Sequence, residues 1–282
     1  MRPLSFADPT AFLARTSTFL HRDEPYNNLL LGIVLRLQRG NLATPAPLLV
    51  AVEEGEEVVL AGAMTPPRKL ILYGETSGSG GLEALVRHLL EQGWTVPGVL
   101  APVGLARSFA QIWHQVSGQP MRQKMRQGVY QLRRVLDRGS APGYLRPAAA
   151  ADIGGLTKWA AAFSQDIGEG PMPPQEARAH VEAVMGRGDL FVWDQGGPVS
   201  MAARARPTTH GMVINMVYTP LLQRGRGYAT ACVAALSQLI LDQGRDFCAL
   251  FTDLDNPTSN HIYQQIGYEW VGEFGDCEFT AV

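Results

Sequence analysis

Two stretches of the chain have the pattern of apolar and polar residues that β-hairpins show. Residues 48–67 read LLVAVEEGEEVVLAGAMTPP, and residues 190–207 read LFVWDQGGPVSMAARARP. Each stretch has an apolar run, a turn that contains glycine, a second apolar run that ends in small residues, and then a proline. The pattern therefore predicts one β-hairpin in each half of the chain.

Apolar residues recur at helical spacing after each hairpin. Residues 82–93 and 232–244 both end at a glycine, which suits the C-terminus of a helix. In each half a β-rich run and a further helix follow, at 96–100 and 104–116 in the first and at 247–254 and 257–266 in the second. The order strand, strand, helix, strand, helix thus occurs twice, which indicates an internal duplication.

Residues 137–143 combine Gly, Pro and Ser and lack apolar periodicity, as linkers do. They divide the 282 residues into near-equal halves, and this length suits two domains. We therefore expect one domain at 1–137 and a second at 142–282.

The composition is that of a globular protein, with 46% hydrophobic and 18% charged residues. The formal charge is −2, whereas a nucleic-acid binder has a basic excess or a basic stripe. We expect no nucleic-acid partner.

Cysteine spacing and the apolar runs indicate the environment of the protein. Cys232, Cys248 and Cys277 have no paired spacing and no close histidines, so we expect reduced thiols and no metal site. The N-terminus lacks the pattern of a signal peptide. The apolar stretch at 29–37 is too short to span a bilayer. We expect a soluble cytoplasmic protein that does not interact with a membrane.

A glycine-rich segment, RGRGYA at 224–229, lies between a predicted strand at 212–218 and a predicted helix at 230–241. Glycines let the backbone approach a ligand closely. The first N–H groups of a helix have no partner within the helix and carry the positive end of its dipole. Arg224 and Arg226 add positive charge, so the segment predicts a site for a pyrophosphate.

Other phosphate-binding loops fit this segment less well. A P-loop has Gly-Lys followed by Ser or Thr, and this tripeptide does not occur in the sequence. A dinucleotide fingerprint needs Gly or Ala as its third small residue, but this sequence has Thr230 at that position. A plain turn with solvated arginines is the remaining alternative for this segment taken alone.

The segment resembles the R/Q-x-x-G-x-G/A signature of the GNAT superfamily of N-acetyltransferases, with Arg224, Gly227 and Ala229 at the defining positions. The resemblance implies that the pantetheine arm of acetyl-CoA pairs with backbone groups of Met216, Val217 and Tyr218. It implies that the CoA pyrophosphate binds to the backbone amides of Arg224, Gly225, Arg226, Gly227, Tyr228, Ala229 and Thr230.

A second segment resembles the superfamily pattern Asn-x-x-Ala-x-x-x-Tyr-x-x-x-Gly-Phe. It has Asn256, Ser259, Tyr263, Gly267 and Tyr268 at those places, with Ser for Ala and Tyr for Phe. Asn256 is expected at the N-cap of a helix, with Tyr263 two turns later on the same face.

The resemblance implies that Asn256 contacts the cofactor arm and that Tyr263 protonates the departing CoA thiolate. A phenol, with a pKa near 10, suits that task. The alternative for Tyr263 is a buried aromatic side chain with its hydroxyl at the surface.

The first half of the chain lacks these groups. Pro102 falls opposite Asn256 and Phe109 opposite Tyr263. We expect the first half to be a degenerate copy, which leaves one active centre per chain.

An amine must lose a proton before it attacks a thioester, and a carboxylate is the usual base. Asp253 is the nearest candidate on the following strand, although it could equally be a structural group at the strand end. Asp166 and Glu169, in the loop after Phe163, are further candidates.

Taken together, the sequence predicts an α/β (α+β) fold of two tandem GNAT-like domains, each a mixed, mostly antiparallel sheet flanked by helices. The expected reaction is direct transfer from acetyl-CoA, a co-substrate, to an amine of a small acceptor. An acyltransferase for a longer acyl-CoA is one alternative. A non-catalytic module that binds acyl-CoA or senses a small molecule is another, and Tyr263 argues against it. The sequence leaves the acceptor and the oligomeric state open.

Overall fold

A computed structural model of the chain describes residues 1–40, 45–74, 79–136, 141–168 and 170–280. The chain divides into two compact units: unit 1 comprises residues 1–129 and 271–282, and unit 2 comprises residues 130–270. Most of the predicted linker, at 137–140, lies outside the described residues.

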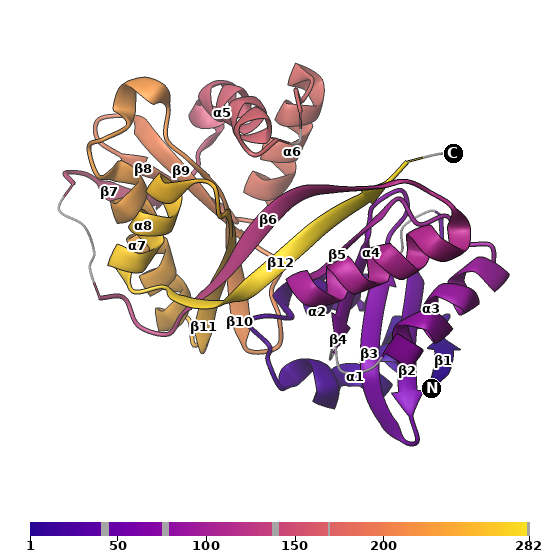
Figure 1. Ribbon diagram of the computed structural model, residues 1–282. Coiled ribbons are helices and arrows are strands. Elements are labelled where there is room, and N and C mark those ends of the chain that lie inside the picture. The colour runs from indigo at the N-terminus through magenta and orange to yellow at the C-terminus, as the bar shows by residue number, and fades with distance from the viewer. Residues whose placement is uncertain (41–44, 75–78, 137–140, 169, 281–282) are drawn as a thin grey trace. The chain divides into compact units, whose positions relative to one another are not determined.

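The strands of unit 1 have the order β1-β2-β3-β4-β5-β12, and the first part of β6 lies on the other side of β12. From β1 to β12 in this order, neighbouring strands are antiparallel except for β4 and β5, which are parallel. Its elements, labelled in Figure 1, are β1 (Arg2–Ser5), α1 (Pro9–His21), α2 (Asn28–Gln38), β2 (Leu48–Glu54), β3 (Glu57–Met64), β4 (Leu70–Gly74), α3 (Ser79–Glu91), β5 (Gly98–Pro102), α4 (Val103–Ser117) and the first part of β6 (Met121–Leu132).

Unit 2 has a sheet of the order β6-β11-β10-β9-β8-β7. Here β10 and β11 are the parallel neighbours, and β7, β8, β9 and β10 pair antiparallel in turn. Its elements are β7 (Tyr144–Pro147), the 3₁₀ turn η1 (Ala150–Asp152), α5 (Ile153–Asp166), α6 (Pro174–Gly186), β8 (Leu190–Asp194), β9 (Pro198–Ala205), β10 (Gly211–Tyr218), the 3₁₀ turn η2 (Leu221–Gln223), α7 (Tyr228–Asp242), β11 (Phe247–Asp253), α8 (Pro257–Ile266) and the start of β12 (Glu269–Phe279).

The element order of the first half is repeated in the second. Each half has a strand, two helices, three strands, a helix, a strand, a helix and a final strand. The predicted hairpins are β2–β3 and β8–β9, so both are confirmed. The predicted class, two tandem units with mixed and mostly antiparallel sheets, is confirmed as well.

The final strand of each half lies beside a strand of the other half. β6 follows α4 in the chain but lies beside β11, and β12 follows α8 but lies beside β5. Tyr130 and Leu132 of β6 are buried in the core of unit 2. Cys277 and Phe279 of β12 are buried in the core of unit 1. The domain limits 1–137 and 142–282 remain a prediction. The two compact units divide at other places, within β6 and within β12.

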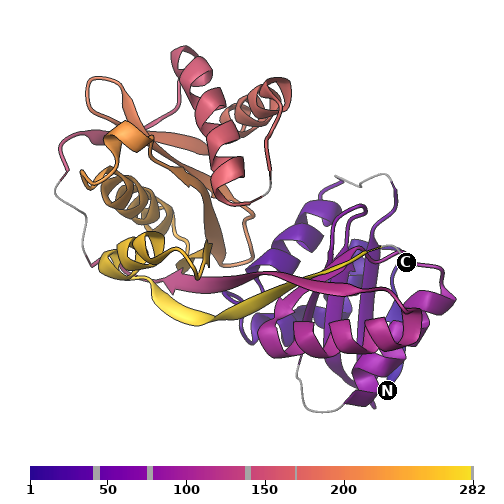
Figure 2. The ribbon, with the colours of Figure 1, turned by 45° about the horizontal axis from the view of Figure 1, so that its top comes forward.

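Helices cover both faces of each sheet because the strands are apolar on both sides. In unit 1, α3 and α4 pack on one face, and α1 and α2 on the other. In unit 2, α7 and α8 bury Leu236 and Ile266 on one face, whereas α5 and α6 bury Leu156 and Val181 on the other. Figure 2 shows α5 and α6 on the opposite side of the unit 2 sheet from α7 and α8.

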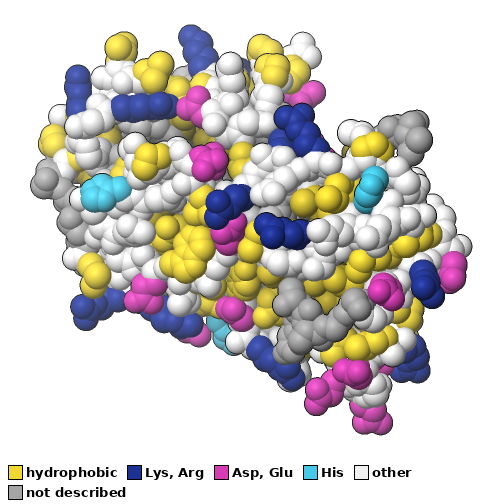
Figure 3. Space-filling view, in the orientation of Figure 1, with side chains coloured by type: hydrophobic (Ala, Val, Ile, Leu, Met, Phe, Trp, Pro, Cys, Tyr) yellow, Lys and Arg dark blue, Asp and Glu magenta, His cyan; other side chains and the backbone are white. Residues whose placement is uncertain are grey.

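Charged side chains of both signs are interspersed on the face shown in Figure 3. Among the described residues, no helix combines the length and the apolar character that a membrane crossing requires.

Candidate active site

The strand β10 is irregular where the sequence predicted a contact with the cofactor arm. Its register against β9 shifts between Asn215 and Tyr218, which marks a bulge. Met216, in this bulge, has a left-handed backbone with φ 52°, a conformation that L-residues other than glycine seldom adopt. The Met216 N–H donates to Oδ1 of Asn215 at 2.8 Å. The bulge is thus held by the side chain of the residue before it.

The parallel strands β10 and β11 pair over only part of their length. Their register joins Gly211–Val213 to Phe247–Ala249, and within the described residues it extends no further, although β10 continues to Tyr218 and β11 to Asp253. Backbone polar groups beyond the paired segment therefore need other partners. An extended polar ligand can provide them between the two strands.

The helix α7 begins directly after the predicted pyrophosphate loop. Gly225 and Gly227 both have φ 77°, a left-handed conformation that costs glycine little. Gly227 is the N-cap residue, and its position offers no side-chain cap to the first turn. Within the described ranges, the first amides of α7 thus have no cap from the N-cap side chain, and they form the kind of anion site that a helix N-terminus provides.

The side chain of Arg224 is anchored rather than mobile. Its Nε atom donates to the carbonyl oxygen of Thr219 at 2.9 Å, and its Nη2 atom lies 2.8 Å from Oδ2 of Asp166. Its guanidinium carbon lies 5.6 Å from the centre of the Tyr218 ring. Arg224 thus ties the loop to β10 and to the C-terminal end of α5. The positive charge that the sequence placed at Arg224 is thus held by these local partners.

The other residues of the loop differ in exposure. Arg226 is exposed, whereas Tyr228 and Thr230 are buried. The Tyr228 hydroxyl bonds to Oε1 of Gln195. Tyr228 and Thr230 can therefore offer a ligand their backbone amides but not their side chains.

The helix α8 begins as the sequence predicted. Asn256 is its N-cap residue, and Asn256 Oδ1 accepts from the N–H of Ser259 at 3.1 Å. Gly267, with φ 111°, ends the helix in a left-handed conformation. The motif thus sets both ends of α8 and with them the position of Tyr263.

Tyr263 is buried, with 8% of its surface exposed. Its ring lies 5.9 Å from that of Tyr268. Burial raises the pKa of Tyr263 to about 12, so the phenol is protonated at neutral pH and can donate a hydrogen bond. Within the described part of the chain, its hydroxyl forms no hydrogen bond.

Asp253 lies at the end of β11 and supports the turn that follows. Its Oδ1 atom accepts from the N–H of Asp255 at 3.0 Å, and its carbonyl oxygen accepts from the N–H of Asn256 at 3.1 Å. Of the other predicted acids, Asp166 is the last residue of α5 rather than part of a loop. Glu169 lies outside the described residues.

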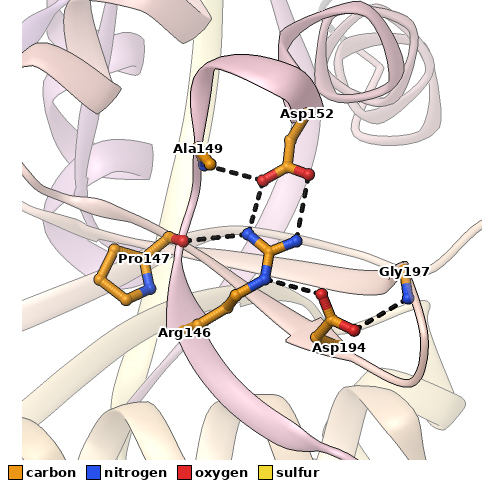
Figure 4. Close-up of polar contacts among 6 residues, drawn as sticks. All are labelled: Arg146, Pro147, Ala149, Asp152, Asp194 and Gly197. Atoms are coloured by element: carbon orange, nitrogen blue, oxygen red, sulfur yellow. Dashed lines mark hydrogen bonds and ion pairs between the residues drawn. The ribbon is translucent and has the colours of Figure 1, made fainter.

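An ion-pair network fixes the start of α5 (Figure 4). Arg146 of β7 donates to Oδ2 of Asp194 at 2.7 Å, and to Oδ2 and Oδ1 of Asp152 at 2.6 and 3.1 Å. The carboxylates also accept from the N–H groups of Ala149 and Gly197. The hydrogen bonds from Arg146 lower the pKa of both aspartates, and the pKa of Arg146 is raised by the same bonds. The network joins β7, β8 and the turn before α5.

Two side chains that the sequence had not indicated lie on the α5–α6 face. Nε2 of His180, on α6, lies 3.2 Å from Sδ of Met216. Trp159, on α5, has its ring centre 6.2 Å from that of Tyr218. His180 belongs to no motif, but it lies three residues after buried Ala177, beside the apolar stripe of α6. That spacing is the sequence signal that could have placed it near the sheet.

The equivalent region of unit 1 differs. Pro102 is the N-cap residue of α4, as Asn256 is of α8, so the predicted correspondence holds, and Phe109 is buried. The strands β4 and β5 also pair only at Leu70–Ile71 within the described residues. A tyrosine side chain, Tyr26, packs here at 5.0 Å from Phe274 between ring centres. Residues 75–78 of the corresponding loop lie outside the described residues.

Among the described residues, no group of three or more His, Cys, Asp and Glu side chains is arranged to hold a metal ion.

Comparison with known proteins gives one family match and many structural ones. Residues 195–274, which include the loop, β11 and α8, match the family model described as FR47-like protein. No curated protein matches the sequence.

Three solved structures resemble the chain over almost its whole length. An acetyltransferase of the GNAT family from Colwellia psychrerythraea has a TM-score of 0.60 and 14% identity, over 99% of this chain and 100% of that one. A GCN5-related N-acetyltransferase from Sphaerobacter thermophilus has a TM-score of 0.61 and 16% identity, over 98% and 95%. A tandem GNAT protein from the clavulanic acid biosynthesis pathway has a TM-score of 0.55 and 12% identity, over 100% and 99%.

At such identities these likenesses establish the fold, and the family match is confined to the segment that carries both motifs. Together they support the resemblance that the sequence indicated: the chain has a tandem fold similar to those of the GNAT acetyltransferases named above, and its second half carries the segment that matches the FR47-like model.

Proposed function

We propose that unit 2 transfers an acetyl group from acetyl-CoA directly to an amine of a small acceptor. The observation that carries this proposal is the open N-terminus of α7, with left-handed Gly225 and Gly227. It lies next in the chain to the segment of β10 that is not paired with β11. The amides of the loop suit the CoA pyrophosphate, and the unpaired strand edges suit the amides of the pantetheine arm.

The amides of β10 would also polarise the thioester carbonyl. Since the Met216 N–H already donates to Asn215, we assign this function to the amides of Val217 and Tyr218. Donors aimed at the oxygen stabilise the negative charge that develops there. The amine nitrogen then forms a bond to the carbonyl carbon, and the bond from that carbon to sulfur breaks.

Tyr263 would donate to the sulfur as it leaves. Its pKa of about 12 exceeds the value of about 8.5 for an alkyl thiol such as cysteine. Burial of the phenol therefore makes complete proton transfer to the sulfur less favourable than it is in water. A hydrogen bond to the developing thiolate, with the proton supplied as CoA departs, is the function that this environment favours.

Asp253 is the base that the sequence predicted, but its surroundings favour a structural function. One carboxylate oxygen already stabilises the turn into α8. The other oxygen would have to accept the proton of the amine.

We further propose that the first half, at 1–137, is a copy of the fold without the catalytic groups. Phe109 stands where Tyr263 is found in the second half, and Tyr26 and Phe274 pack together near the strands of that unit. One active centre per chain follows.

Substituting the two left-handed glycines at the ends of α7 tests the proposal. Gly227→Ala places a Cβ in the loop, whereas Gly244→Ala imposes the same backbone strain beyond the other end of the helix, where φ is 85°. Each change should destabilise the fold by about 1–2 kcal/mol. Only Gly227→Ala should weaken acetyl-CoA binding, by tenfold or more in isothermal titration.

Equal affinities for the two variants would contradict the loop assignment. Titration with longer acyl-CoA analogues shows which acyl chain is preferred. A screen of amino acids, polyamines, aminoglycosides and peptides for CoA release identifies the acceptor. If acetyl-CoA binds tightly but no amine releases CoA, the chain is a binding module.

A further inference from the structure

We propose that the acceptor is an amine that carries an aromatic ring, and that this ring binds against Trp159 of α5 and Tyr218 of β10; the inference rests on the proposed transferase function. The ring centres of these two side chains lie 6.2 Å apart, and their planes are inclined by 45°. Both side chains are half-buried, so each keeps part of its surface open to solvent. Aromatic rings attract one another edge to face or offset, and a partly exposed pair can therefore take a third ring.

The acceptor has to approach from the α5–α6 side of the unit 2 sheet. Tyr263 belongs to the core between the sheet and the helices α7 and α8, so in the proposed reaction the sulfur leaves on that side. The incoming nitrogen and the departing sulfur take different positions on the same tetrahedral carbon, and the nitrogen therefore needs another direction of approach. Trp159 and Tyr218 pack against the core on the opposite face, which α5 and α6 cover (Figure 2).

Tyr218 connects this aromatic surface to the reacting atoms. Its backbone amide is one of the two that we assigned to the thioester carbonyl, whereas its side chain extends to Trp159. The guanidinium carbon of Arg224 also lies 5.6 Å from the centre of the Tyr218 ring, and the two contacts hold the ring in place. An amine whose nitrogen reaches the carbonyl carbon while its ring packs on Tyr218 needs only a short chain between the two.

The surroundings of this surface favour an aromatic acceptor over a polycation or a sugar. Two polar side chains in the last turn of α5 already have partners: Asp166 pairs with Arg224 at 2.8 Å, and Ser164 donates to a backbone carbonyl oxygen at 3.0 Å. Phe163 and Met172 add partly buried apolar surface to the same core. A polyamine would need carboxylates and a sugar several hydrogen-bonding side chains, whereas this surface offers mainly apolar contacts.

Three acceptors that differ in the group beside the amine test the substrate class. 2-Phenylethylamine carries a ring, putrescine a second positive charge, and glucosamine several hydroxyl groups. Hydroxylamine carries none of these, and it reports whether the chain transfers acetyl groups at all. Each is supplied with acetyl-CoA to the full chain, and CoA release is measured through its free thiol after subtraction of the rate without protein.

The variants are Trp159→Ala, the conservative Trp159→Phe, and the control Trp94→Ala. Trp94 is also a half-buried tryptophan, but it packs against the core of unit 1. Each variant is described by the ratio of its kcat/KM for 2-phenylethylamine to that for hydroxylamine, since this ratio does not depend on the fraction of folded protein.

We expect the wild type to prefer 2-phenylethylamine to putrescine and to glucosamine by about tenfold or more in kcat/KM. Trp159→Ala should lower the ratio by about 10–100-fold, mainly through a higher KM, because apolar contacts to a substrate contribute on this scale. Trp159→Phe should retain most of the ratio, because it keeps an aromatic ring. Trp94→Ala should leave the ratio unchanged.

A wild-type preference for putrescine or glucosamine, or transfer to hydroxylamine alone, would overturn the substrate class and leave the transferase standing. An unchanged ratio in Trp159→Ala, or an equal loss in Trp94→Ala, would overturn the placement of the ring. If the wild type binds acetyl-CoA but transfers to none of the four nucleophiles, the proposed transferase itself fails and the substrate assignment fails with it. The comparison of acceptors uses the wild type, so it decides the substrate class even where Trp159→Ala does not fold.

Discussion

Truncation of Phe279 to alanine tests whether β12 stabilises unit 1 rather than unit 2. Phe279 is the last residue of β12, with 8% of its surface exposed. Its ring lies 5.7 Å from that of Trp113, nearly parallel to it, and 6.4 Å from that of Phe109. Both partners lie on α4. The substitution thus removes a buried ring from the core of unit 1, although it lies near the C-terminus of the chain.

The expected loss of stability follows from this burial. Phe→Ala substitutions in cores cost about 3–5 kcal/mol, and a position at the end of a strand favours the lower value, about 3 kcal/mol. For a unit of this size, each kcal/mol lowers the melting temperature by about 2–4 °C. Unit 1 should therefore melt about 6–12 °C lower.

Hydrogen exchange read by mass spectrometry resolves the two units. Phe279→Ala should speed exchange in α3, α4 and β5, with little change in α7 and α8. Phe191→Ala is the matched control, because Phe191 is equally buried but lies in the core of unit 2. It should show the opposite pattern. Faster exchange in α7 and α8 after Phe279→Ala would refute the strand exchange, since it would mean that β12 packs within its own half.

Two further predictions concern unit 2. Tyr263→Phe should lower the rate of acetyl transfer by about 10²-fold with an unchanged acetyl-CoA dissociation constant, and full turnover would exclude the phenol as the hydrogen-bond donor to the leaving thiolate. Arg146→Gln should lower the melting temperature by several degrees at pH 7, because Asp152 and Asp194 lose the partner that lowers their pKa. The stabilisation by Arg146 is complete above a pH of about 3.9, the pKa of an aspartate in the unfolded chain. It is lost as the pH falls through the lower pKa values that Asp152 and Asp194 have in the folded chain. The gap between variant and wild type in differential scanning fluorimetry should therefore close in strong acid, and a gap that does not depend on pH would contradict this account.

The candidate site was predictable where its groups belong to continuous segments. The loop at 224–229 and the helix that begins at Asn256 could be identified because glycine conformation, helix capping and helical spacing are properties of neighbouring residues. The contact between His180 and Met216 was not predictable, since it joins residues from different elements that only the packing of α6 against the sheet brings together. The anchoring of Arg224 by Asp166 has the same origin.

The tandem repeat, its hairpins and the half that carries the motifs follow from the amino-acid sequence alone, because each rests on a local pattern of apolar, turn and capping residues. The places of β6 and β12 in the sheet could be learned only from the folded chain. A buried strand presents the same apolar residues to either sheet, so the pattern of Glu269–Phe279 does not reveal its neighbour. The choice between the sheets depends on pairing with β5 and on packing against α4, contacts between residues more than 100 positions apart in the chain.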